Sequence, residues 1–252
     1  MLPALYPILM NRRDKIIERL LKEVDIDKDT QNDETGGGHT ALIFAAEIGY
    51  IKGINLLLEA GADRTTTNKF GKTALYMACE KEHLDAVKEL CKGFDKSYIN
   101  AMSNRGMTAI MQAARSNKHL KIVKYLTSQN ADLSPNGAQT TTLHLACDRG
   151  SPSFIREIIK HDKNLIATLE RKEKYTGKTP LMCACSSACS KGGAESVQEL
   201  LDVIKEKFVS EKVKEYILAK DDEGNNTLSI ACKRGNLEVL VILCDNILKM
   251  VF

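Results

Sequence analysis

Short apolar segments rich in small residues recur along the chain, and an amphipathic segment follows each one. Residues 41–46 read Ala-Leu-Ile-Phe-Ala-Ala, and residues 54–58 then read Ile-Asn-Leu-Leu-Leu. In the second segment, leucine and isoleucine are spaced three and four residues apart, which places them on one side of a helix. The pattern therefore predicts pairs of helices: a short inner helix that packs closely against its neighbours, and an outer helix with one apolar side.

The apolar segments share one pattern with a nearly constant period. They are Thr40–Ala46, Thr73–Cys79, Thr108–Ala114, Thr141–Cys147, Thr179–Cys185 and Asn226–Cys232. Successive segments begin 33, 35, 33, 38 and 47 residues apart. A threonine at the start of a helix can accept hydrogen bonds from free backbone amides. One helix pair cannot cover its own apolar surface, so the pairs are expected to stack.

Glycine stands two residues before the threonine position at almost every repeat, where a tight hairpin needs positive φ. These glycines are Gly38, Gly71, Gly106, Gly177 and Gly224, and Gln139 takes the place in the remaining repeat. The segments resemble the T-P-L-H-x-A signature of the ankyrin-repeat family. Gly61-Ala-Asp63 and Asn130-Ala-Asp132 also match the family's helix-ending G-A-D. The resemblance implies an all-α ankyrin-repeat solenoid of stacked helix-turn-helix units with short β-hairpin connections.

We expect a single ankyrin-repeat domain over residues 1–252. Residues 1–31 form a degenerate N-terminal cap whose outer helix is Asn11–Glu23, and six repeats follow from about residue 32 to residue 252. The sixth is expanded by insertions, and Val197–Ala219 is expected to form one long helix or two short ones. Insertions in solenoids can carry binding specificity or can be tolerated loops, and both interpretations stay open.

No residue pattern predicts catalysis or metal binding. Cys183, Cys185 and Cys189 are the densest group of possible zinc ligands, but the C-x-C pair points in different directions on a helix. Cys185 is in register with Cys79, Cys147 and Cys232, at the small core-facing position of the repeat. His144 lies at the family's usual histidine position, where the resemblance implies hydrogen bonds to a neighbouring repeat. We therefore predict no enzyme activity, no cofactor and no metal.

Composition and charge indicate in which compartment the protein is found and which classes of partner it binds. A net charge of +3 from 36 basic and 33 acidic residues is too balanced to predict nucleic-acid binding. Eight cysteines are too few for a disulfide scaffold, and no apolar run is long enough to span a membrane. We expect a soluble protein of the cytoplasm or of the nucleus. The final segment, Leu240–Phe252, is unusually apolar for a terminal cap and is expected to contact further repeats or another chain.

The resemblance implies a protein-protein interaction scaffold or adaptor that binds a protein or peptide through the concave surface of hairpin tips and inner helices. Alternatives are a regulator or inhibitor of a partner enzyme, and the targeting module of a larger protein. Because several of the surface positions are basic, an acidic partner is expected. The positions are Lys69, Phe70, Lys72, Tyr76, Lys81, Asn104, Arg105, Met107, Met111, Arg115, Ser116, Gln139, Asp148, Arg149, Tyr175 and Lys178.

Overall fold

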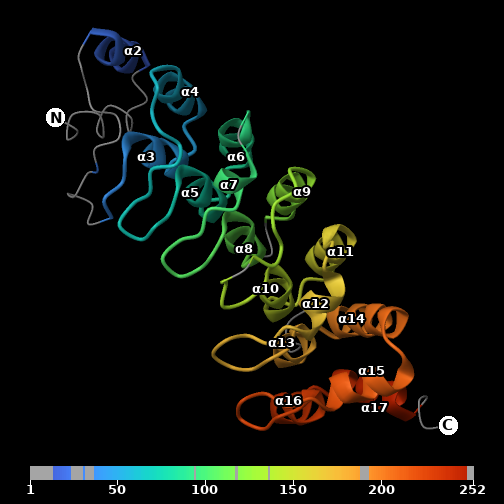
Figure 1. Cartoon of the computed structure of the whole chain (residues 1–252). Helices are drawn as coiled ribbons and strands as arrows, with labels where there is room; N and C mark the ends of the chain where they lie inside the picture. The colour runs from blue at the N-terminus through green and yellow to red at the C-terminus, as the bar shows by residue number, and fades with distance from the viewer. Residues whose placement is uncertain are drawn as a thin grey trace. The chain divides into compact units, whose positions relative to one another are not determined.

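The computed structural model describes residues 14–23, 31, 37–93, 95–116, 119–135, 137–187 and 193–248. Regular secondary structure in these residues is helical (Figure 1). Backbone contacts divide the chain into two compact units. The first unit comprises Met1–Ala113 with Lys121–Asp132, and the second comprises Ala114–Leu120 with Leu133–Phe252. The expectation of one continuous domain over residues 1–252 stays a prediction.

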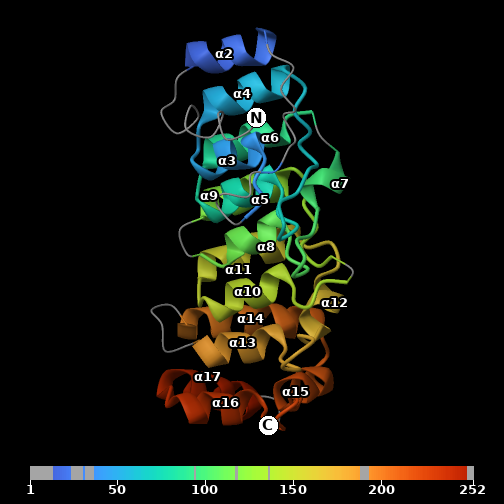
Figure 2. The ribbon, with the colours of Figure 1, turned by 90° about the vertical axis from the view of Figure 1, so that its left-hand side faces the viewer.

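The first unit stacks inner helices α3, α5 and α8 beside outer helices α2, α4, α6 and α9, with the short helix α7 before the third hairpin. The bounds are Asp14–Glu23 (α2), Ala41–Glu47 (α3), Ile51–Glu59 (α4), Ala74–Glu80 (α5), Leu84–Cys91 (α6), Lys96–Ile99 (α7), Ala109–Ala114 (α8) and Leu120–Ser128 (α9). Figure 2 looks onto the row of inner helices.

The second unit repeats this arrangement with inner helices α10, α13 and α16 and outer helices α11, α14 and α17, and it adds α12 and α15. The bounds are Thr142–Asp148 (α10), Pro152–His161 (α11), Leu165–Glu170 (α12), Pro180–Ser187 (α13), Gly193–Lys207 (α14), Ser210–Leu218 (α15), Thr227–Arg234 (α16) and Leu237–Leu248 (α17). The stack of helix pairs expected from the sequence is confirmed within each unit.

Side-chain caps start the inner helices where the repeated pattern predicts them. The Thr73 hydroxyl accepts a hydrogen bond from the Tyr76 amide at 3.2 Å, and the Thr141 hydroxyl accepts one from the His144 amide at 3.3 Å. In α16, Asn226 replaces threonine, and its side chain accepts from the Ser229 amide at 2.9 Å. Each cap satisfies an amide that has no partner inside its own helix, and such a cap is worth about 1 kcal/mol.

Small residues allow the inner helices to pack against each other. Ala78 and Cys79 in α5, like Ala146 and Cys147 in α10, are fully buried. Helix α3 packs on α5 in the first unit, and α13 packs on both α10 and α16 in the second. A larger side chain at these positions would separate neighbouring repeats, since overpacking a close interface typically costs about 1–3 kcal/mol.

The outer helices cover the inner ones with their apolar sides. Ile54 and Leu57 of α4 and Ile155 and Ile158 of α11 have no exposed surface. Outer helices also contact each other along the stack, as α4 does with α6 and α11 with α14. Burial of each such side chain contributes about 1.5–3 kcal/mol relative to exposure.

Several sequence expectations are resolved by these helices. The segment Val197–Ala219 falls within two helices, α14 and α15, which are separated at Phe208 and Val209. The expected outer helix Asn11–Glu23 corresponds to α2 from Asp14 onward, and residues 11–13 lie outside the described residues. Within the described part of the chain, no helix is long and apolar enough to cross a membrane.

The prediction that Cys232 occupies a core-facing position is wrong. Cys79, Cys147 and Cys185 are fully buried at this register, whereas Cys232 is exposed. Helix α16 contacts mainly α13, α15 and α17, and no other described helix pair packs over its opposite side. The register that buries the other cysteines depends on a following repeat.

Candidate protein-binding surface

The hairpin tips are fixed by hydrogen bonds within each turn. In the first unit the Asn68 side-chain oxygen accepts from the amides of Phe70 and Lys72, each at 3.0 Å. In the second unit the Asp221 carboxylate accepts from the amides of Glu223 at 3.0 Å and Asn225 at 2.7 Å. The polar side chain at the start of each turn therefore sets the conformation of the tip.

Backbone hydrogen bonds also join neighbouring tips within each unit. In the first unit, Lys69 donates to the Gly37 carbonyl at 3.2 Å and Asn104 donates to the Phe70 carbonyl at 3.0 Å. In the second unit, Lys174 donates to the Gln139 carbonyl at 2.9 Å. Asp222 similarly donates to the Thr176 carbonyl at 3.1 Å. Side chains on the tips therefore project from a connected backbone.

Two glycines permit this close approach. Gly71 and Gly177 have φ values of +70° and +64°, which favour glycine. A Cβ on Gly71 would lie 2.7 Å from the Asn104 amide nitrogen, and one on Gly177 would lie 2.9 Å from the Asp222 amide nitrogen. The glycine pattern read from the sequence thus reflects both the turn and the contact with the next tip.

One exposed aromatic residue stands on a tip in each unit. Phe70 has 54% of its surface exposed and lies between Lys69 and Gly71-Lys72 in the sequence. Tyr175 has 70% of its surface exposed and follows Lys174. Each unit therefore presents a large apolar ring beside basic side chains.

Acidic partners reduce the positive charge expected on the inner-helix side of the first unit. Lys72 lies 2.8 Å from a carboxylate oxygen of Glu80, and its amino group is 5.1 Å from the centre of the Tyr76 ring. Lys81 pairs with Glu47 at 3.1 Å. The basic character is therefore weaker at the helices than the sequence suggested.

Two of the expected surface positions belong to the core. Met111 has no exposed surface and Tyr76 retains 5%. The Tyr76 hydroxyl donates to the Gln112 side-chain oxygen at 3.1 Å, so its polar end is occupied within the protein. The expectation that these two side chains face a partner is corrected, because both are buried within the protein.

The remaining expected positions keep surface, but they are divided between the two units. The first unit exposes Lys69, Phe70, Lys81, Asn104 and Arg105 and half-buries Lys72 and Met107. The second unit exposes Arg115, Asp148, Arg149 and Tyr175 and half-buries Ser116, Gln139 and Lys178. The expected positions therefore form two groups of side chains, one on each unit.

His144 is a buried link between repeats. Its Nε2 lies 3.1 Å from the Lys178 carbonyl oxygen, and its Nδ1 lies 2.8 Å from the Thr141 hydroxyl. Since a carbonyl only accepts, Nε2 carries the proton. Burial lowers the pKa of His144 to about 4, so the ring is neutral at pH 7. The hydrogen bond to a neighbouring repeat, which the resemblance implied, is confirmed.

The core cysteines have little thiolate character. Burial raises the pKa of Cys185 to about 12, and the pKa of Cys91 is also raised to about 12. A thiol with such a pKa is a poor nucleophile at neutral pH. Among the described residues no group of three potential ligand side chains could hold a metal ion. Cys189 lies outside the described residues.

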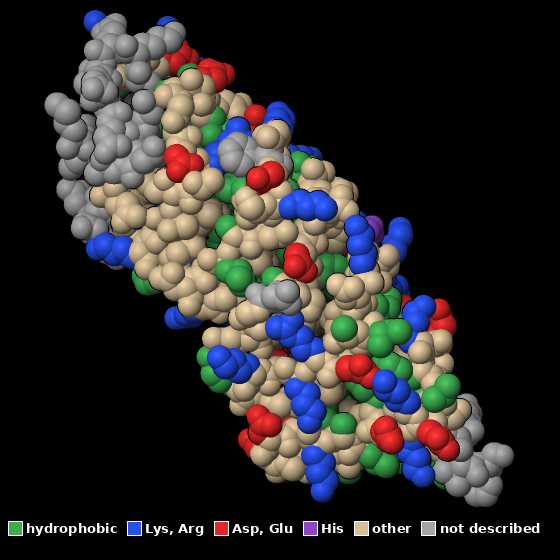
Figure 3. Space-filling model, viewed as in Figure 1, with side chains coloured by type: hydrophobic (Ala, Val, Ile, Leu, Met, Phe, Trp, Pro, Cys, Tyr) green, Lys and Arg blue, Asp and Glu red, His purple; other side chains and the backbone are tan. Residues whose placement is uncertain are grey.

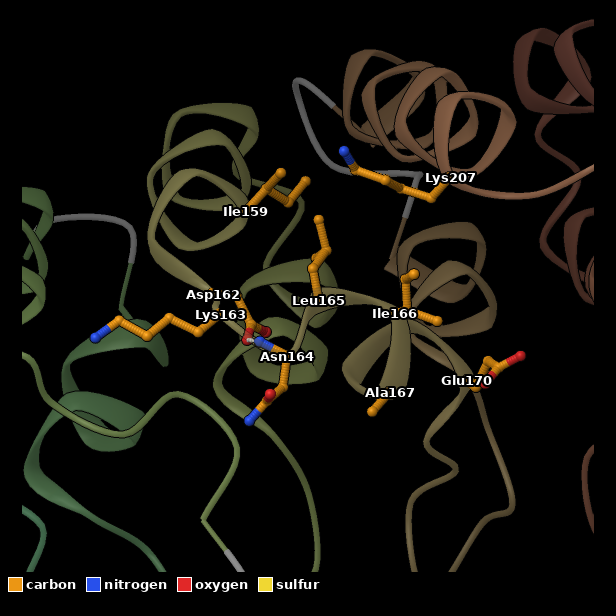
Figure 4. A pocket seen from close by; sticks show the side chains of 9 residues that line it. All are labelled: Ile159, Asp162, Lys163, Asn164, Leu165, Ile166, Ala167, Glu170 and Lys207. Atoms are coloured by element: carbon orange, nitrogen blue, oxygen red, sulfur yellow. Dashed lines mark hydrogen bonds between the residues drawn. The ribbon is translucent and has the colours of Figure 1, made fainter.

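A hollow that the sequence did not predict lies within the second unit, between the end of α11, helix α12 and the end of α14 (Figure 4). It measures about 610 Å³. Ile159, Leu165 and Lys207 point toward the same space, while Lys163 points away (Figure 4). Around this region, Figure 3 shows hydrophobic side chains exposed among charged ones. Helix α12 and the extra length of α14, which help to form the hollow, are additions to the regular helix pair.

The sequence matches models of a known protein family. Residues 54–137 and 133–210 match the family described as ankyrin repeats in three copies, and residues 37–69 match the single ankyrin repeat. The chain belongs to the ankyrin-repeat family. The matched residues include both Phe70 and Tyr175, so the two aromatic tips lie within ankyrin repeats.

Other ankyrin-repeat proteins are similar to this chain at modest identity. Protein glp-1 of Caenorhabditis elegans is 28% identical over 167 residues, which are 61% of this chain and 12% of glp-1. Mouse inversin is 26% identical over 208 residues, 82% of this chain and 18% of inversin. The Drosophila melanogaster DNA replication inhibitor plutonium is 35% identical over 108 residues, 42% of this chain and 58% of plutonium. The chain thus spans less than a fifth of glp-1 and of inversin.

Proposed function

We propose that this chain is a scaffold or adaptor that binds a partner protein through its hairpin tips. Ankyrin repeats are generally protein-protein interaction modules. The observation that carries the proposal is the pair of exposed aromatic rings, Phe70 and Tyr175, each on a tip held by backbone hydrogen bonds to its neighbours. A backbone held in this way loses little conformational freedom on binding. Aromatic residues are enriched where interfaces gain most of their free energy.

The chemistry around the rings favours an acidic partner segment with an apolar side chain. Beside Phe70, Arg105 is exposed on the neighbouring tip of the first unit. Lys174 is exposed next to Tyr175 in the second unit. Carboxylates of a partner could pair with these cations while its apolar side chain packs on the ring. Because Lys72 and Lys81 already pair with glutamates, we place the acidic preference at the tips.

We assign no catalytic role to the chain. The buried, neutral His144 and the buried core thiols are held by the fold, and neither type of group opens onto a described pocket. The support for a binding role therefore comes from the surface and from the family.

Selection of peptides on the intact chain tests this function. We expect peptides selected from a random display library to be enriched in Asp and Glu near an apolar residue. A peptide that binds the first unit should bind the Phe70→Ser and Arg105→Glu variants at least about tenfold more weakly, and a peptide that binds the second unit should do so with the Tyr175→Ser variant, because each change removes a central contact. Fluorescence anisotropy of the labelled peptide measures the affinity.

The matched control is Val209→Ser, which removes an apolar side chain that is 73% exposed at the start of α15. This variant should bind the peptide as the unaltered chain does. Selected peptides without acidic enrichment would refute the charge preference. Affinity that none of the three tip variants changes would refute the proposed surface.

A further inference from the structure

Three hairpins of the chain close in the same way. In each, the amide of the first residue donates to the carbonyl of the last. The bonded pairs are Asn68 and Lys72 at 3.0 Å, Ser103 and Met107 at 2.9 Å, and Asp221 and Asn225 at 2.8 Å. Between the members of each pair lie three residues, and the third of them is a glycine. A regular hairpin tip of this chain therefore has three residues.

The hairpin that leads into α13 has one residue more. Its closing bond joins the Glu173 amide to the Lys178 carbonyl at 2.9 Å, so four residues lie between them. They read Lys-Tyr-Thr-Gly, whereas the regular tip at residues 69–71 reads Lys-Phe-Gly. The lysine and the glycine are common to both tips, so the additional residue stands between them.

Hydrogen bonds to the neighbouring tips identify the additional residue as Tyr175. The Lys174 amide donates to the Gln139 carbonyl of the preceding tip at 2.9 Å. The Thr176 carbonyl accepts from the Asp222 amide of the following tip at 3.1 Å. In the regular tip at residues 69–71, two adjacent residues make the corresponding bonds. Tyr175 is therefore inserted between two residues that both stay attached to neighbouring tips.

The enlarged turn is held from inside, while its additional side chain faces outward. The Glu173 carboxylate accepts from the Thr140 hydroxyl at 2.9 Å and from the Thr176 hydroxyl at 2.8 Å. Tyr175 has 70% of its surface exposed, compared with 54% for Phe70 on the regular tip. The insertion therefore adds little buried surface to the fold, and its main effect is to expose an aromatic ring on an ordered backbone.

The charged side chains near Tyr175 differ in sign. Lys174 is exposed directly before it. Asp222 and Glu223 are exposed on the following tip, which is joined to this one by the bond from Asp222. A partner that surrounds the ring is therefore complementary if it places carboxylates toward Lys174 and basic side chains toward the following tip.

We propose that Tyr175 determines which partner the second unit binds, by entering an apolar pocket on a folded protein whose pocket has carboxylates on one side and basic side chains on the other. This inference rests on the proposed function and specifies the partner of the second unit. A ring on an inserted residue is open to contact on both faces, and a pocket contacts both. Aromatic side chains that fill desolvated pockets are typical centres of binding free energy.

Two single-residue deletions separate the ring from the insertion that exposes it. Deleting Tyr175 leaves the three-residue tip Lys-Thr-Gly, without the ring. Deleting Thr176 leaves Lys-Tyr-Gly, which keeps the ring at the position that Phe70 has in Lys-Phe-Gly. Because each deletion restores a turn of regular length, both variants should unfold close to the temperature of the parent chain.

The probes are binders selected on the intact chain from a display library of one small folded domain with a randomised surface. Among them we expect a class that binds both deletion variants at least about tenfold more weakly than the parent chain, as measured by biolayer interferometry. Lys174→Glu and Glu223→Lys should each weaken the same class, because each reverses a charge beside the ring. Val209→Ser is the control and should leave the affinity unchanged.

The outcomes separate this inference from the proposed function. Binders that need Tyr175 but bind the Thr176 deletion as they bind the parent chain would overturn the role of the insertion, since the ring alone would then suffice. If no binder is weakened by deleting Tyr175, the inference is wrong, but weakening by Phe70→Ser or Arg105→Glu would still support binding through the tips. Binders that tolerate both charge reversals would overturn the proposed charges of the pocket.

Discussion

The two units contain the same helix pair, but the second unit has longer additions outside it. The inner helices α5 and α10 each have 7 residues, one in each unit. The outer helices differ more, since α6 has 8 residues and α14 has 15. The additions α12 and α15 follow outer helices as well. Inner helices pack against neighbours along the stack, so their length is constrained, while the ends of outer helices can be extended.

The additions in the second unit are held by specific contacts. The Tyr216 hydroxyl of α15 donates to the Leu169 carbonyl of α12 at 2.6 Å. Lys212 pairs with Glu170, and its amino group is 5.0 Å from the centre of the Phe208 ring. Phe208 in turn stacks on Tyr216 with 6.2 Å between ring centres. The insertion is therefore a packed part of the unit.

The largest expected effect is a loss of stability in one unit that leaves the other unit protected. Phe154 of α11 is 1% exposed, and at the same register α6 carries the small residue Ala86. Phe154→Ala should lower the free energy of unfolding by about 3–5 kcal/mol, because it leaves a large cavity. Hydrogen exchange measured by mass spectrometry in low urea should show lost protection in α10, α11 and α13.

The control is Leu57→Ala in the first unit, where Leu57 is fully buried. It should reduce the hydrogen-exchange protection of α3 and α4, because it too leaves a cavity in the core. If either substitution lowers protection equally in both units, they unfold as one cooperative block and the comparison between them fails.

A smaller effect comes from His144, which has Tyr76 as its counterpart in the first unit. Burial lowers the pKa of His144 from 6.5 to about 4 in the folded chain. Between these values the unfolded chain binds a proton that the folded chain does not. The free energy of unfolding should therefore be highest above pH 6.5 and fall toward pH 4, by on the order of 3 kcal/mol from this group.

Urea unfolding at pH 7 and pH 4.5 measures this contribution. A His144→Gln variant keeps a donor for the Lys178 carbonyl but does not titrate, so it should lose less free energy between the two pH values than the parent chain. An equal loss in both proteins would show that other groups cause the pH dependence.

Local signals explain why much of the fold could be predicted from the sequence. Thr73 and Gly71 act within a few residues of themselves, through a cap and a turn, so their spacing alone locates an inner helix. The exposure of Cys232 depends instead on whether another repeat covers α16. Cys232 and Cys185 both follow an alanine at the same position of the repeat, so the register alone does not separate them.

The candidate surface was harder to predict for the same reason. Phe70 and Tyr76 are both aromatic residues near one hairpin, yet Phe70 is 54% exposed and Tyr76 is 5% exposed. The pairing of Lys72 with Glu80 joins a hairpin to the end of the next helix. The hollow beside α12 requires the end of α14 to lie over another repeat. Each of these depends on how elements pack and not on periodicity.

The smallest effect tests how firmly the second unit holds its insertion. Tyr216→Phe removes the hydroxyl that donates to the Leu169 carbonyl, and it should cost about 1–3 kcal/mol because that buried acceptor loses a partner. The loss should appear in hydrogen exchange as reduced protection of α12 and α15, while α10 and α13 keep theirs. Tyr175→Phe is the control, since this exposed ring should tolerate the change within about 0.5 kcal/mol. Protection that falls evenly across the second unit would mean that α15 is part of its core, and the distinction between a constrained inner row and tolerant outer ends would then hold only for the first unit.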